Sequence, residues 1–184
     1  KQLDVVAEME SARMVSLVVD EEAFHSELEV VTNERRLVVD NNPDGLLSER
    51  LFANAYEKHP YGWPTVGWMK DLQQLKPEDA RDFYRRFYAP NNATIFLVGD
   101  VEPKEAAALI DGHYGSILSS DFERPMRSEE PSQTAERREQ LTLSMSSDRV
   151  LVGLKVPEYT HADIPALLVL DAALTSGRTG RLVR

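Results

Sequence analysis

The chain has 184 residues, which suits one large domain or two small ones and is enough for a single hydrophobic core without disulfides or metals. It contains 21 Lys and Arg and 31 Asp and Glu, so its net charge is −10. This negative charge argues against nucleic acid and anionic membranes as partners. Cysteine is absent, which excludes disulfides, thiolate catalysis and cysteine-ligated zinc but leaves the compartment open. No apolar run approaches the roughly 20 residues that a membrane span needs.

Both ends of the chain have the character of internal sequence. The first residues enter an amphipathic pattern without a cap, and residues 182–184 are apolar and basic without a stop signal. We therefore expect the chain to be a piece of a longer polypeptide.

The first half of the chain is predicted to be mainly helical. Periodic apolar residues predict helices over 3–15, 22–39 and 46–57, with a breaker cluster at 41–45. Pro77, followed by two acidic residues, predicts the start of another helix. The apolar stripe of this helix is formed by Ala80, Phe83, Tyr84, Phe87 and Tyr88.

The middle of the chain is predicted to contain one strand and one helix before a linker. The apolar run 93–98 is typical of a strand buried on both faces, and Pro103 begins a helix that reaches about residue 113. Residues 119–138 are polar, charged and proline-containing, so they predict a linker and a domain boundary.

The last part of the chain is predicted to form a hairpin and a helix. Residues 139–146 and 150–156 resemble two strands around a short turn, and 162–176 is a strongly apolar helix closed by Gly177. Because strands and helices mix without strict β-α-β alternation, the predicted fold class is α+β.

Two carboxylates on the second predicted helix are the strongest chemical signal. On a helical projection, Glu27 and Glu34 lie two turns apart, within the arc of Leu28 and Val31 that should be buried. A buried carboxylate normally has a cation, a metal or hydrogen-bond donors as its partner. The residues alone leave three explanations open: an ion pair with Arg35, a helix edge that stays in water, or a metal or catalytic role.

Other site signatures are weak or absent. The four histidines do not form an i, i+4 pair, and each has an ordinary structural explanation: they are His25, His59, His113 and His161. The sequence contains no phosphate-binding loop and no nucleophile elbow. The basic, glycine-rich turn at 177–181 is compatible with anion binding or with a simple helix C-cap.

An ordered set of motifs covers nearly the whole chain and resembles the M16 zinc peptidases, the family of pitrilysin, insulinase and mitochondrial processing peptidase. The set begins with Glu27 to Glu34 and continues through Asp40 to Pro43. Its later members are His59-Pro60-Tyr61-Gly62, Phe83-Tyr84, the stretch 88–93, Val98-Gly99-Asp100, Val156-Pro157, Asp171 and the stretch 177–182. Each motif alone is unspecific, and the resemblance rests on the order and spacing of the motifs along the chain.

The resemblance implies a fold and a domain arrangement. It implies part of a LuxS/MPP-like metallohydrolase fold, in which an antiparallel sheet packs with helices. Residues 1–118 would be the later part of a first M16-type domain and 119–138 the linker. Residues 139–184 would be the start of a second such domain.

The resemblance also implies a metal site. In this family, zinc is held by the two histidines of a His-x-x-Glu-His motif and by a glutamate roughly 75 residues downstream. Glu34 aligns with that third zinc ligand, and Glu27 aligns with an acidic residue that supports the site through charge and hydrogen bonding. The two histidines would lie about 40 residues before Lys1, so no catalytic residue is expected within this chain. One ligand is too few, and we expect the chain alone to bind zinc weakly or not at all and to lack peptidase activity.

The function implied for the parent protein is zinc-dependent endopeptidase activity. Zinc would lower the pKa of a bound water, and a glutamate would accept the proton. The expected substrate is a peptide or an unfolded protein. The expected partner is a second M16-type half, in the same chain, an identical subunit or a different one. The compartment, bacterial periplasm or cytoplasm, stays open.

Two alternatives remain at this stage. The family contains non-catalytic halves that serve as substrate-binding or scaffold partners of an active half. A plain α+β interaction domain would require the ordered motifs to be coincidental, and it would be favoured if Glu27 and Glu34 lay on an exposed helix face.

Overall fold

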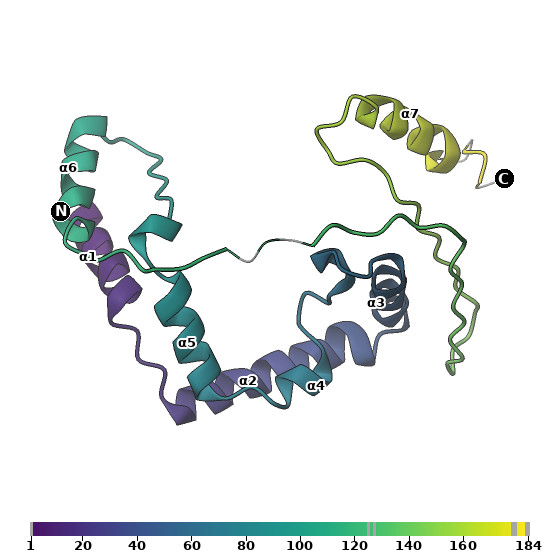
Figure 1. Cartoon of the computed structure of the whole chain (residues 1–184), viewed down its shortest axis with the longest axis horizontal. Helices are drawn as coiled ribbons and strands as arrows, with labels where there is room; N and C mark the ends of the chain where they lie inside the picture. The colour runs from purple at the N-terminus through teal and green to yellow at the C-terminus, as the bar shows by residue number, and fades with distance from the viewer. Residues whose placement is uncertain (1, 125, 127, 178–179, 183–184) are drawn as a thin grey trace. The chain divides into compact units, whose positions relative to one another are not determined.

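The computed structural model describes residues 2–124, 126, 128–177 and 180–182. It divides into two compact units, Lys1–Glu136 and Arg137–Arg184. The division falls within the segment 119–138 that the sequence marks as a linker. The first unit contains the helices up to α6, and the second contains α7 (Figure 1).

The helices predicted from the sequence are present, with ends displaced by a few residues. The α-helices are α1 (Gln2–Val15), α2 (Glu21–Arg35), α3 (Pro43–Ala55), α4 (Met69–Leu72), α5 (Pro77–Phe87), α6 (Pro103–Tyr114) and α7 (Ile164–Thr175). A π-helical segment, η1 (Arg36–Asp40), continues α2, and two 3₁₀ turns are η2 (Pro60–Gly62) and η3 (Pro90–Asn92). The short helix α4 was not predicted.

Local capping explains where several helices begin and end. The Asp20 carboxylate accepts a hydrogen bond from the Ala23 amide at 2.7 Å and begins α2. The Asn42 side chain accepts from the amide of Asp44 at 3.1 Å and begins α3. Gly177 follows α7 with a φ of +64°, as the predicted C-cap requires.

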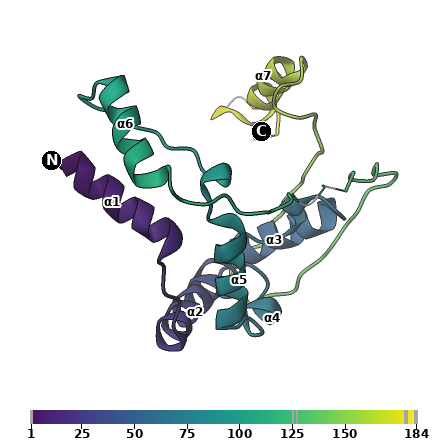
Figure 2. The ribbon, with the colours of Figure 1, turned by 60° about the vertical axis from the view of Figure 1, so that its left-hand side comes forward.

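Within the first unit, α1 packs beside α6, and α2 contacts α4 and α5 (Figures 1 and 2). The Tyr84 hydroxyl of α5 donates to the Arg13 carbonyl at 3.0 Å and accepts from the Leu17 amide at 3.2 Å. The Arg81 guanidinium donates to the Val19 carbonyl at 2.8 Å. Helix α5 therefore holds the connection between α1 and α2 in place.

The expected α+β fold class, with its antiparallel sheet, is wrong for this structure. The described residues contain no β-strand, and the predicted strand runs 93–98, 139–146 and 150–156 are extended or bent without a strand partner. Phe96 is 84% exposed and Val98 is 98% exposed. Strand propensity is realised only when neighbouring strands pair with the backbone and cover the side chains. The three runs have a high strand propensity, but no neighbouring strand among the described residues pairs with them. The regular secondary structure of the described residues is therefore helical.

The buried apolar residues among those described are few and dispersed, and three of the five are alanines. Among the described residues they are Ala7, Val39, Leu72, Ala89 and Ala106. An apolar core of this size contributes little, so polar contacts become important for the geometry of the first unit. No described helix combines the length and the apolar character needed to cross a membrane.

Candidate functional site

Helix α2 turns one narrow face inward. Phe24, Leu28 and Val31 are half-buried, and Arg35 and Val39 are buried. Their spacing of three or four residues places them on one side of the helix and its π-helical extension. An arginine therefore occupies a position that the pattern would assign to an apolar residue.

Glu27 and Glu34 lie outside this face and are both exposed. The prediction that they are buried is wrong, because the projection gave the angle of each residue and overestimated the width of the covered arc. Neither pairs with Arg35 in any contact between described residues, so the ion-pair explanation does not hold either. The part of the chain that the structure describes contains no group of three or more His, Cys, Asp or Glu able to hold a metal. The metal role of Glu34 and the supporting role of Glu27 stay predictions.

Arg35 is the centre of a buried polar cluster. Its Nη1 and Nη2 atoms lie 2.5 Å and 3.0 Å from the two carboxylate oxygens of Glu49. Nη1 also donates to the Gly67 carbonyl at 2.8 Å, and Nη2 lies 3.2 Å from Asp40. The guanidinium carbon lies 6.0 Å from the centre of the Trp68 ring. One side chain thus connects α2, η1, α3 and the segment before α4.

The electrostatics of the cluster favour the charged form of Arg35. The hydrogen bond to Glu49 is the largest influence and raises the pKa of Arg35 above its ordinary value, against the opposing effect of burial. Its Nε is buried without a hydrogen-bond partner among the described residues. Arg35 was expected on this face, but its partner Glu49 was missed, because the pairing joins residues fourteen positions apart on two different helices.

The π-helical segment η1 brings the end of α2 close to the start of α3. The Asn41 amide donates to the Arg36 carbonyl at 2.8 Å, the i→i−5 pattern of a π-helix. A β-carbon added to Gly45 would lie 2.0 Å from the Val38 carbonyl oxygen. A glycine is therefore required at this crossing, and the sequence pattern identified residue 45 only as a helix breaker.

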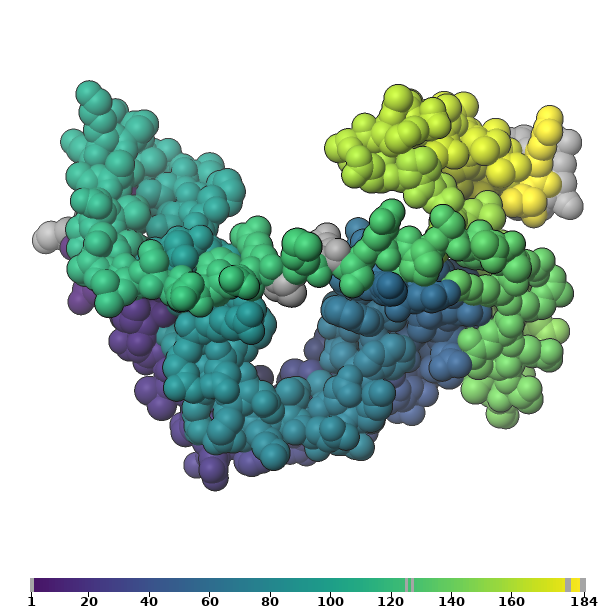
Figure 3. Space-filling view, viewed as in Figure 1, coloured from purple at the N-terminus to yellow at the C-terminus, as the bar shows by residue number. Residues whose placement is uncertain are grey.

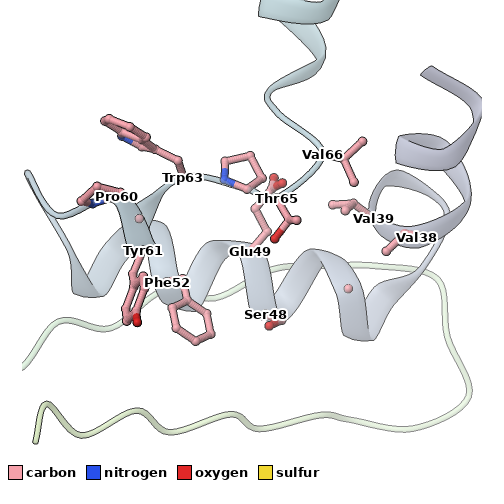
Figure 4. Close-up of a pocket in the computed structure, with 13 residues that line it drawn as sticks. Val38, Val39, Ser48, Glu49, Phe52, Pro60, Tyr61, Trp63, Thr65 and Val66 are labelled. Atoms are coloured by element: carbon pink, nitrogen blue, oxygen red, sulfur yellow. The ribbon is translucent and has the colours of Figure 1, made fainter. Parts of the chain in front are cut away.

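A pocket of about 750 Å³ lies between η1, α3 and the η2 loop (Figure 4). Phe52 and Tyr61 lie at one end of it, and Val38, Val39 and Val66 lie at the other. The remaining lining residues are Gly45, Ser48, Glu49, Pro60, Gly62, Trp63, Pro64 and Thr65. The lining is mainly apolar, with the Arg35-paired Glu49 among its few charged or hydroxyl-bearing members.

The four histidines are dispersed. His25 is exposed, His59 accepts from the Tyr61 amide at 3.2 Å, and His161 accepts from the Asp163 amide at 3.2 Å. His113 of α6 lies 2.9 Å from a carboxylate oxygen of Asp4 of α1. The proposed anion-binding turn at 177–181 includes residues 178 and 179, which lie outside the described residues.

Comparison with protein families matches residues 74–184 to the family described as Peptidase M16 inactive domain. The chain belongs to the M16 peptidase family. This match confirms the resemblance to the M16 family. It therefore excludes the hypothesis that the chain is an interaction domain unrelated to peptidases, although that hypothesis had predicted the exposure of Glu27 and Glu34. The match begins before the expected linker, within the part that was assigned to a first domain.

Individual relatives agree with the family. The M16 chain is 35% identical over 188 residues to "Zinc protease PqqE" of Helicobacter pylori, covering 98% of this chain and 41% of the relative. It is 47% identical over 52 residues to "Probable zinc protease PqqL" of Escherichia coli, covering 28% of this chain and 6% of the relative. A crystal structure of a protease from Helicobacter pylori aligns with a TM-score of 0.75 and 30% identity, over 99% of this chain and 45% of the other. The chain thus spans less than half the length of these relatives.

Proposed function

We propose that the protein to which this chain contributes is a zinc-dependent metalloendopeptidase, with Glu34 as a zinc ligand and Glu27 as a supporting carboxylate. The observation that carries this proposal is the 35% identity to "Zinc protease PqqE" along 98% of the chain. The exposed position of Glu34 on α2 leaves its carboxylate accessible to a metal held by ligands from elsewhere in the protein.

The described residues do not form a zinc site by themselves. A catalytic zinc needs three protein ligands, and Glu34 is one carboxylate without a neighbouring ligand set. A hydrolytic site would therefore need ligands from outside the described residues. The contribution of this chain is geometric, because the buried pairing of Arg35 with Glu49 fixes the end of the helix that presents the adjacent Glu34.

A non-catalytic role is the second candidate. It is favoured by the family match itself, since residues 74–184 match a domain described as inactive. In this case the protein would bind substrate or act as a scaffold for an active M16 half. For both candidates the proposed substrate is a peptide or unfolded protein. The proposed partner is a second M16-type half on the same chain, an identical subunit or a different one.

Replacing Glu34 in the full-length protein tests the ligand assignment. We expect Glu34→Gln to weaken zinc binding by at least about tenfold, because the neutral amide loses the charge that attracts the metal. Glu27→Gln should have a smaller effect, consistent with outer positions around a metal. Zinc affinity is measured by competition with a chelator. Glu29→Gln, an exposed acid on the same helix, is the control and should bind zinc like the original protein.

Unchanged zinc affinity in Glu34→Gln would refute the assignment of this ligand. A full-length protein that binds no zinc and cleaves no peptide, but supports cleavage by a companion subunit, would establish the non-catalytic candidate instead.

The 184-residue chain alone is expected to show no chelator-sensitive peptidase activity. The reason is the single expected ligand, which does not satisfy the coordination of a catalytic zinc. The assay incubates the chain with zinc and an unfolded fluorogenic protein, with and without chelator. Clear turnover that the chelator abolishes would contradict this expectation.

A further inference from the structure

Three consecutive backbone amides after α3 converge on one carboxylate. The amide of Glu57 donates to Glu130 Oε1 at 3.0 Å and to Oε2 at 3.2 Å. The amides of Lys58 and His59 each donate to Glu130 Oε2 at 2.8 Å. Successive backbone N–H groups arranged in this way form an anion-binding concavity, commonly called a nest.

The loop that forms this nest is shaped by its own contacts. The ring centres of Tyr56, His59 and Tyr61 lie 4.5 to 5.8 Å apart in pairs. His59 Nδ1 accepts from the Tyr61 amide, and a β-carbon on Gly62 would lie 2.9 Å from the Tyr56 carbonyl oxygen. These contacts do not involve Glu130. The loop around the three amides thus has contacts of its own besides the hydrogen bonds to Glu130.

The carboxylate comes from the segment that joins the two units. Glu130 lies 71 to 73 positions after the amides that it accepts from, and seven positions before the start of the second unit at Arg137. The same segment is held upstream, where the Asn91 side chain donates to the Ser120 carbonyl at 2.9 Å and the Ser120 hydroxyl donates to the Arg86 carbonyl at 2.9 Å. These two hydrogen bonds attach the upstream part to α5 and η3, and in the space-filling view green atoms of the linker lie against teal atoms of the first unit (Figure 3). Glu130 thus attaches the linker to the loop after α3 at a second point, downstream of Ser120.

We propose that the backbone amides of residues 57–59 form a carboxylate-binding site whose ligand is Glu130, and that this pair is a latch fixing the linker to the first unit. A carboxylate suits the site because an ionised acceptor forms stronger hydrogen bonds with N–H groups than a neutral one. The latch fixes this point of the linker on the first unit, and it is independent of zinc binding at Glu34.

Removing the carboxylate from the 184-residue chain tests the latch. In Glu130→Ala, we expect the amides of Glu57, Lys58 and His59 to exchange with deuterium at least about tenfold faster than in the original chain. Glu130→Gln should give an intermediate effect, because its amide oxygen still accepts but carries no charge. The control is Glu129→Ala, whose exposed carboxylate is the neighbour of Glu130, and it should leave these three amides unchanged.

A peptide added in trans tests whether the site recognises a carboxylate. In the Glu130→Ala chain, an excess of a capped synthetic peptide with the sequence of residues 128–135 should restore slow exchange at the three amides. The same peptide with Gln in place of the residue-130 Glu should not. Unchanged exchange in Glu130→Ala, or equal effects of the two peptides, would overturn the proposal.

Discussion

Replacing Arg35 by Met is expected to lower the free energy of unfolding of the first unit by about 3–5 kcal/mol. The substitution leaves the buried Glu49 carboxylate, whose side chain is 7% exposed, without its cation. It also removes the donor to the Gly67 carbonyl, which holds the segment before α4. The measurement is urea unfolding followed by helical circular dichroism.

Two further variants distinguish the effect of losing the buried Arg35–Glu49 pair from the effect of removing a charged side chain at the surface. The double variant Arg35→Met, Glu49→Leu should recover part of the loss, because no uncompensated charge is then buried. Glu78→Gln breaks the exposed pair of Glu78 with Arg81 and should change stability by no more than about 0.5 kcal/mol. A loss for Arg35→Met no larger than that for Glu78→Gln would show that the cluster is not structural.

The contribution of the Arg35–Glu49 pair to the free energy of unfolding should not change through deprotonation of Arg35 near neutral pH. Its pKa is raised in the folded state by the hydrogen bond to Glu49. A raised pKa on a base gives stability that is complete below the unfolded-state pKa and disappears only as pH rises through the folded-state value. The pH at which Arg35 would lose its proton lies in strong alkali, so Arg35 stays charged at every pH used in the unfolding measurement.

Replacing Gly45 by Ala is expected to lower the free energy of unfolding by about 2–3 kcal/mol. The new β-carbon would lie 2.0 Å from the Val38 carbonyl oxygen and 3.1 Å from its carbonyl carbon. Both are backbone atoms of the π-helical segment, so they move only if η1 or α3 shifts. Urea unfolding measures the loss, and a change in near-ultraviolet circular dichroism would report the shift around Trp63 and Trp68.

Gly112→Ala in α6 is the matched control. A β-carbon there would meet no atom within 4 Å, and the backbone is helical. The substitution should stabilise the chain by about 0.5–1 kcal/mol, because alanine loses less conformational entropy than glycine in a helix. If Gly45→Ala were as stabilising as Gly112→Ala, the close approach of η1 and α3 would not exist in solution.

The sequence predicted the helices well because their signals are local. Apolar periodicity, Pro77 at a first turn and Gly177 after a last one act within a few residues along the chain. The caps Asp20 and Asn42, which the structure added, are local in the same way. The ordered motifs also predicted the family, and the match over 74–184 confirmed it. The candidate ligand Glu34 was chosen from these same motifs and is still a prediction.

Other features were decided by tertiary structure. The runs 93–98, 139–146 and 150–156 have the composition of strands, but a strand exists only through a neighbour, and the described residues supply none. The exposure of Glu27 and Glu34 depended on how wide a face of α2 is covered, which a helical projection does not contain.

The contacts that join distant residues were equally invisible to sequence patterns. The pairing of Arg35 with Glu49 and the capture of Glu130 by the amides of 57–59 each connect separate elements. The sequence by itself therefore determined the helices and the family of this protein, because caps, periodicity and motif order are properties of neighbouring residues. Which charges are buried, which carboxylates stay exposed and where the linker attaches were decided only by tertiary structure, because burial and pairing arise when separate segments pack together.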